Sequence, residues 1–156
     1  MLKLLRVDDR LLHGQVAFLW TKYLAIQSIL IANDNAAHDE FMKMTLGMAK
    51  PIGVELQIIE VSQAVKVLKE NKESRQSMMV VVNTLEDAER LIHETGFIHS
   101  LNLGGLRERP NTTRISHSIT LNEEDKEICR RLILEGIEIE IRMVPENKKI
   151  MVGKMI

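Results

Sequence analysis

Short apolar runs alternate with helical patterns along most of the chain. The runs Ile29–Ala32 and Met78–Val82 show no polar alternation, which is typical of strands covered on both faces. Between the runs, apolar residues recur at helical spacing, as Val16 and Trp20 do. The pattern predicts an α/β fold: an open, mostly parallel sheet of about seven strands with helices on both faces. The predicted strands cover residues 1–7, 27–32, 53–60, 78–82, 98–103, 114–121 and 137–143.

Two helices carry specific expectations about the core. A helix that follows Asn33-Asp34-Asn35 and runs to about Ala49 places Phe41, Met44, Thr45 and Met48 on one face, and methionine commonly fills gaps in a core. We expect that face to be buried. In the helix from Gln15 to Leu24, the aromatic residues Trp20 and Tyr23 are expected to be core anchors without a chemical role.

Two strands show clear alternation of apolar and polar residues. Ile137–Met143 alternates throughout, which predicts one wet face and a position at the edge of the sheet. In the strand 114–121, Ile115, His117 and Ile119 fall on one face, so we expect His117 to lie in the core. The last residues, from Pro145 to Ile156, are expected to add a final helical turn.

Composition narrows the functional class. The 156 residues are 45% hydrophobic and 28% charged, as in one globular domain, here residues 1–156. A net charge of −1 and only 3% aromatic residues give no reason to expect binding to nucleic acid or anionic lipid. No run approaches the roughly 20 apolar residues of a membrane span, and no signal peptide is recognisable. Cys129 has no partner for a disulfide, and no metal-ligand motif is present, so we expect a cytoplasmic protein without a metal.

The candidate chemistry follows the first strand. Ligands of open parallel sheets bind at the carboxyl ends of the strands, where the stretch from Arg6 to Val16 (RVDDRLLHGQV) brings two arginines, two aspartates and a histidine together. A neutral imidazole is nucleophilic near pH 7, so His13 is a candidate phosphoryl carrier. Asp8 or Asp9 could then fix the imidazole tautomer or hold Arg10.

A phosphoryl group on His13 needs donors, and the start of the next helix provides them. The amides after His13 and the helix dipole favour an anion, and Gly14 lacks a Cβ that would block close approach. Arg10 offers a planar fork to phosphate oxygens. We therefore expect Gly14, Gln15 and Arg6 to bind phosphate, with Arg10 assisting catalysis. The same charges could instead form only a solvated salt-bridge cluster.

The stretch from Arg6 to Val16 resembles the signature of the IIB components of the mannose/fructose/sorbose family of the bacterial sugar phosphotransferase system. The resemblance covers nearly the whole chain. It includes Trp20-Thr21-Lys22, the segment Asn102–Gly105 and the strand Gly136–Arg142. The first motif is long and specific, and the others support it.

The resemblance implies that His13 accepts a phosphoryl group on Nδ1 from a phosphohistidine of the IIA protein. His13 then passes the group to a sugar that enters through the membrane components IIC and IID. Asp8 and Arg10 would assist, the amides around Gly14 would hold phosphate, and no cofactor is expected. No segment resembles IIA, so the donor is expected to be a separate polypeptide.

Several properties are left open by the resemblance. It implies a cytoplasmic protein held at the inner face of the cell membrane through IIC and IID, and it allows a homo-oligomer. It gives no role to Arg107, Arg109 or Arg114, because the loop they occupy differs from the family pattern. It does not name the sugar.

Two other classes of protein compete with this reading. A receiver-type signalling module needs an aspartate after the third strand and a lysine after the fifth, where this chain has Glu60-Val61 and Gly104-Gly105. A nucleotide-binding enzyme would show a glycine-rich phosphate motif, and none occurs. A silent regulatory subunit of the same fold is a third alternative, against which the presence of His13 argues.

Overall fold

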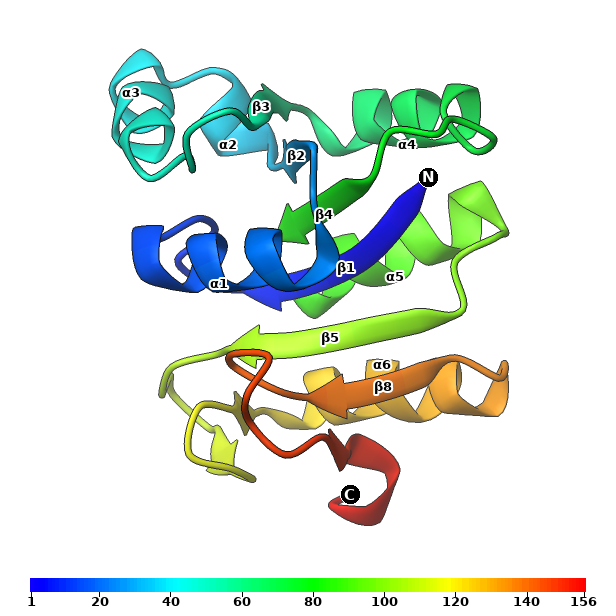
Figure 1. The fold of residues 1–156 in the computed structure, drawn as a ribbon. Coiled ribbons are helices and arrows are strands. Elements are labelled where there is room, and N and C mark those ends of the chain that lie inside the picture. Colours follow the sequence, from blue (N-terminus) through cyan, green and yellow to red (C-terminus); the bar gives the residue numbers. More distant parts are fainter.

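A computed structural model describes all residues, 1–156, and shows a seven-stranded sheet in the order β3-β2-β4-β1-β5-β8-β9 (Figure 1). All neighbouring strands are parallel except β9, which runs antiparallel to β8. The predicted fold class is therefore confirmed. The strands of the sheet are β1 (Leu2–Asp8), β2 (Ser28–Ala32), β3 (Glu55–Ile59), β4 (Met78–Val82), β5 (Ser100–Gly105), β8 (Glu138–Ile141) and β9 (Ile150–Met151).

Helices cover both faces of the sheet and create two cores. The smaller core, of 12 buried residues, lies under the first three helices, and the larger one, of 28, lies under the next three. In β2, Ile29 and Ile31 face the smaller core, whereas Leu30 and Ala32 face the larger one, which explains the unbroken apolar run. The helices are α1 (Gly14–Leu24), α2 (Asp34–Ala37), α3 (Glu40–Met48), α4 (Val61–Glu70), α5 (Leu85–Thr95), α6 (Glu123–Leu134) and the 3-10 turn η1 (Val152–Lys154).

The expected single helix that ends near Ala49 is wrong in two respects. It is broken into α2 and α3, because Asp39 caps a new helix by accepting a hydrogen bond from the Met42 amide at 3.0 Å. The break also changes which face is buried. Leu46 enters the core, whereas Phe41, Met44 and Met48 are exposed to solvent.

Only one of the two expected aromatic anchors of α1 is buried. Trp20 is 1% exposed and belongs to the smaller core, as predicted, but Tyr23 is 59% exposed. The buried stripe of α1 runs through Ala17 and Trp20, and Tyr23 lies outside it, contacting the Trp20 ring edge-on at a centroid distance of 6.1 Å.

The expected strand over 114–121 does not exist as one element. It is a small antiparallel pair, β6 (Thr113–Arg114) and β7 (Thr120–Leu121), separate from the main sheet. His117 lies in the connecting turn and is exposed, so its expected place in the core is wrong. The Arg114 guanidinium donates to the carbonyl of His117 at 2.9 Å and stabilises this turn.

The last alternating strand is not at the edge of the sheet. β9 covers β8 on its outer side, so the edges are β3 and β9. The expected wet face is found only in part: Glu138 is exposed, but Glu140 on the same face is 7% exposed and pairs with Arg142 at 3.1 Å. An alternating pattern shows that polar residues share a face, but it does not show whether that face is covered.

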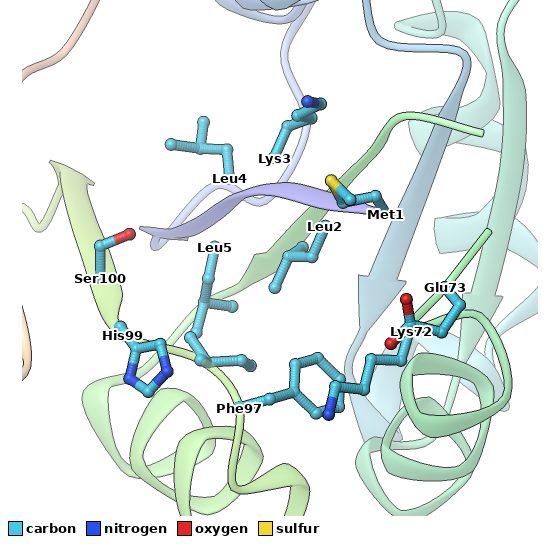
Figure 2. A pocket seen from close by; sticks show the side chains of 11 residues that line it. Met1, Leu2, Lys3, Leu4, Leu5, Lys72, Glu73, Phe97, His99 and Ser100 are labelled. Carbon is cyan, nitrogen blue, oxygen red and sulfur yellow. The ribbon is translucent and has the colours of Figure 1, made fainter. Parts of the chain in front are cut away.

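A hollow of about 420 Å³ lies at the amino end of β1 (Figure 2). Met1, Lys72, Phe97 and His99 are among its lining residues. It is at the opposite end of β1 from His13, so it is not part of the predicted site. None of the helices is long and apolar enough to cross a membrane.

Candidate functional site

The loop between β1 and α1 is wrapped around Asp8. Its carbonyl accepts a hydrogen bond from the Leu11 amide at 2.8 Å, and its Oδ1 accepts one from the Arg10 amide at 3.0 Å. Leu11 has a φ of 60°, which is uncommon for a residue with a Cβ, and its side chain is buried. This turn therefore brings the chain back over the end of β1. The next residues, Leu12 and His13, lead directly into α1.

His13 is held against Asp8. Its Nε2 lies 2.7 Å from Asp8 Oδ2, and the backbone of His13 is extended because it is the residue that precedes α1. The imidazole is 23% exposed, whereas the carboxylate is 2% exposed. A neutral ring with Nε2 facing an ionised carboxylate carries its proton on that nitrogen. Nδ1 then keeps its lone pair.

The Asp8 carboxylate is kept ionised despite its burial. Burial by itself raises the pKa of Asp8, but the hydrogen bond from His13, the charge of Arg6 and the Arg10 amide together lower this pKa below its ordinary value. The site thus contains an ionised carboxylate next to the imidazole at neutral pH. Such a charge stabilises a cationic imidazole ring.

The amino terminus of α1 is open to an anion. No side chain caps it, and no acidic residue lies in its first turn. The amides of Gly14, Gln15 and Val16 have no acceptor within the helix, as at any helix start. A Cβ on Gly14 would meet nothing within 4 Å, so the approach to these amides is clear. By contrast, side chains of Asn33, Asp39, Thr84 and Asn122 cap α2, α3, α5 and α6.

Arg10 is the free cation of the site. Its side chain is exposed, and its guanidinium has no hydrogen bond or ion pair with the rest of the chain. The backbone of Arg10 is nevertheless fixed by its amide bond to Asp8. A guanidinium on a fixed backbone next to an open helix terminus is well suited to bind an oxyanion.

Arg6 lies in a different place from the one expected. It is 2% exposed, and its guanidinium donates to Asp8 Oδ2 at 3.1 Å and to Asn102 Oδ1 at 2.8 Å. Its donors are therefore used within the protein, underneath Asp8. This arrangement favours a role in holding Asp8 over direct contact with phosphate.

Asp9, whose role the sequence left open, connects two loops. Its Oδ2 accepts hydrogen bonds from the amide of Arg107 at 2.8 Å and from Nε of the same residue at 3.2 Å. Arg109 makes no hydrogen bond with the His13 loop. Its Nη2 donates to Asp125 Oδ2 at 2.9 Å, at the start of α6. The loop after β5 is thus attached on one side to the His13 loop and on the other to α6.

Sequence reasoning missed the buried polar residues beneath the site. Asn102 accepts a hydrogen bond from Arg6 and donates to Glu140 Oε1 at 3.3 Å. The indole nitrogen of Trp20 donates to the Met143 carbonyl at 2.9 Å, and its ring lies 5.7 Å from the Arg6 guanidinium carbon. One signal was present: Asn102 is a polar residue between two leucines of a buried strand. No group of three or more His, Cys, Asp or Glu side chains is arranged to hold a metal ion.

Comparison with known proteins extends this picture to the whole chain. The family model described as "PTS system sorbose subfamily IIB component" matches residues 2–156. The probable phosphotransferase enzyme IIB component of Streptococcus pyogenes serotype M6 is 30% identical, over 100% of this chain and 99% of its own length. The mannose-specific EIIAB component of Escherichia coli K12 is 33% identical over 147 residues. The chain spans about half of that relative, since the match covers 94% of this chain and 46% of the relative.

Solved structures give the same assignment. The IIBSor domain of the sorbose permease of Klebsiella pneumoniae superposes with a TM-score of 0.92 at 26% identity, over 99% of this chain and 95% of that one. The protein manxB of Thermoanaerobacter tengcongensis gives 0.90 at 30% identity, over 98% and 93%. The match to the family model over residues 2–156, together with these relatives, shows that the chain belongs to the sorbose subfamily of IIB components of the phosphotransferase system.

Proposed function

We propose that the chain is a phosphocarrier that accepts a phosphoryl group on Nδ1 of His13 and passes it to a sugar. The observation that carries the proposal is the 2.7 Å contact between His13 Nε2 and the buried Asp8 carboxylate, beside the uncapped start of α1. The contact leaves Nδ1 as the nucleophilic nitrogen. The helix start supplies the site in which the attached phosphate can lie.

The first transfer follows from this geometry. The Nδ1 lone pair attacks phosphorus of a phosphohistidine on the donor, the bond from phosphorus to the donor nitrogen breaks, and the donor ring keeps that electron pair. His13 becomes cationic when Nδ1 binds phosphorus, because Nε2 keeps its proton. Asp8 stabilises this cation through the existing Nε2 contact. No proton has to leave His13 in this step.

The second transfer reverses the events at His13. A sugar hydroxyl oxygen bonds to phosphorus and releases its proton to solvent, while the bond from phosphorus to Nδ1 breaks and Nδ1 recovers its lone pair. In both steps the α1 amides at Gly14 and Gln15 and the free guanidinium of Arg10 stabilise charge on the transferring group. Neither step requires a cofactor.

The sole thiol is not a competing carrier. Cys129 is fully buried in the larger core, and burial raises the pKa of its thiol to about 12. A protonated thiol without access to solvent is a poor nucleophile. The receiver-type alternative gains no support either, because Glu60, at the end of β3, is the capping residue of α4.

The relatives suggest the partners. The name of the mannose-specific EIIAB component joins an A and a B part in one protein, and this chain matches 46% of it. We infer that the phosphoryl donor is a IIA protein or domain and that the acceptor sugar is presented by membrane components IIC and IID. Residues 1–156 then act as one carrier domain on the cytoplasmic side of the membrane. Mannose-, sorbose- and fructose-specific relatives do not select one sugar.

The test is phosphorylation by the upstream phosphotransferase proteins with labelled phosphoenolpyruvate. The wild-type chain is expected to take up one acid-labile, alkali-stable phosphate, as a phosphoramidate does, and His13→Gln none. A Cys129→Ala variant, which keeps His13, should be labelled like the wild type. Label that survives in His13→Gln, or phosphate stable in acid, would contradict the proposal.

A further inference from the structure

The guanidinium of Arg6 lies directly beneath the residue that orients His13. We propose that Arg6 is a positioning residue: by fixing the Asp8 carboxylate, it keeps the His13 proton on Nε2 and so makes Nδ1 the nucleophile. The inference rests on the proposed function and adds the part of the protein that selects the reacting nitrogen. It gives Arg6 no contact with phosphate.

The contacts of the guanidinium fix its orientation. Nη2 donates to Asp8 Oδ2 at 3.1 Å, while Nη1 donates to Asn102 Oδ1 at 2.8 Å and to the Arg142 carbonyl at 3.2 Å. Because the guanidinium is planar, anchoring Nη1 also sets where Nη2 lies. A lysine at this position would bring a charge without such a fork.

The residues that anchor Arg6 are themselves held. Asn102 Nδ2 donates to Glu140 Oε1 at 3.3 Å and to the Arg142 carbonyl at 3.1 Å, and Arg142 pairs with Glu140 at 3.1 Å. Arg6 and Arg142 balance Asp8 and Glu140, so the buried group carries no formal net charge. A buried network with its charges paired is rigid. The orientation of Asp8 therefore depends on strands β1, β5 and β8 together.

Gly104 provides the space that this arrangement needs. A Cβ built at this position would fall on the Arg6 guanidinium, far inside the 3.0 Å that real Cβ contacts essentially never breach. At the neighbouring Gly105 a Cβ would be 3.4 Å from Asp8 Oδ1, an ordinary contact. Of the two adjacent glycines, only Gly104 has to be glycine for Arg6 to stay in place. Gly105 can therefore serve as the control position.

The consequence for His13 follows from the Asp8 carboxylate. Asp8 Oδ2 is shared by Arg6 Nη2 and His13 Nε2, and Oδ1 is held by the Arg10 amide. Because both carboxylate oxygens are fixed, Asp8 Oδ2 stays in position to accept a hydrogen bond from the proton on His13 Nε2. If Arg6 were displaced, the carboxylate could rotate away, and the neutral ring would exchange between its two tautomers.

The experiment combines long-range ¹H–¹⁵N NMR of the His13 ring with identification of the phosphohistidine isomer. In the wild type we expect protonated Nε2, unprotonated Nδ1 in the neutral ring, and phosphate on Nδ1. Gly104→Ala should give averaged ¹⁵N shifts, at least tenfold slower phosphoryl acceptance and a detectable fraction of Nε2-linked phosphate. Gly105→Ala should stay within about twofold of the wild-type rate and keep the wild-type ¹⁵N pattern.

Arg6→Lys carries the test if Gly104→Ala does not fold. It should show the same ¹⁵N averaging to a smaller degree. Variants that lose only thermal stability, with the tautomer and phosphate isomer unchanged, would show that Arg6 is merely structural and would overturn the inference. A wild-type chain that is not phosphorylated on His13 would instead refute the proposed function, while the NMR comparison of the unphosphorylated variants would still test the role of Arg6.

Discussion

At the scale of single residues, the site separates two kinds of positive charge. Arg6 is buried and hydrogen-bonded through both Nη atoms to groups of the protein, whereas Arg10 is exposed and its guanidinium is free. A side chain that must bind an incoming phosphoryl group has to be unoccupied in the resting protein. Arg10 meets this requirement and Arg6 does not, although the sequence analysis expected both side chains to contact phosphate.

Arg10→Ala should therefore slow transfer without destabilising the protein. A hydrogen bond to a charged group contributes about 1.5–3 kcal/mol, which corresponds to about a tenfold to hundredfold slower phosphoryl acceptance. The Arg10 amide that binds Asp8 is retained, so the free energy of unfolding should change by less than about 0.5 kcal/mol. Rapid-quench phosphorylation and urea unfolding measure the two quantities, and Arg10→Lys should recover part of the rate. Unchanged kinetics in Arg10→Ala would show that this charge has no part in transfer.

At the scale of elements, periodicity predicted the strands that are buried on both faces better than the elements that are buried on one face. β2 and β4 were predicted because their residues face two cores in turn. The region 114–121 failed because alternation also occurs by chance in a hairpin whose strands have two residues each. The prediction of the buried face of α3 failed because Asp39 starts a new helix. The spacing of apolar residues does not determine how α3 is rotated relative to α2.

The exposed position of α3 makes its one glycine testable. Gly47 lies inside the helix with open space around it, so Gly47→Ala should raise the free energy of unfolding by about 0.5–1 kcal/mol. Gly53 also has open space but a φ of 82°, so Gly53→Ala should lower it by about 1–2 kcal/mol. Thermal or urea unfolding of both variants measures the difference. Equal effects of the two substitutions would contradict the backbone geometry described here.

At the scale of the whole molecule, the site depends on residues far apart in the chain. The Arg6–Val16 stretch made the grouping of His13, Asp8 and Arg10 predictable, because the strand-to-helix transition lies within one continuous segment. Asn102 and Arg142 were not predictable as partners of Arg6, since their contacts arise only when β1, β5 and β8 pair. The burial of Glu140 on the otherwise polar face of β8 has the same cause, because a positive partner, Arg142, is placed beside it.

This long-range pairing also determines how the protein responds to acid. The pKa of Asp8 is lower in the folded chain than the value of about 3.9 of an unfolded aspartate. Its contribution to stability is thus complete above the unfolded pKa and is lost as the pH falls through the folded pKa. Asp8→Asn should be less stable than the wild type by about 3 kcal/mol at pH 7, because Arg6 stays buried without its counterion.

The difference between Asp8→Asn and the wild type should shrink as the pH is lowered below about 4, since the unfolded wild-type aspartate then binds a proton while the folded carboxylate stays ionised down to its lower pKa. Urea unfolding of both proteins at pH 7 and at pH 3 measures it. Glu127→Gln serves as the control, because Glu127 pairs with Arg130 at the exposed surface and should show little difference at either pH. A stability difference between Asp8→Asn and the wild type that stays constant from pH 7 to pH 3 would mean that the ionised carboxylate does not stabilise the fold, and the Arg6–Asp8 pair would then serve only to orient His13.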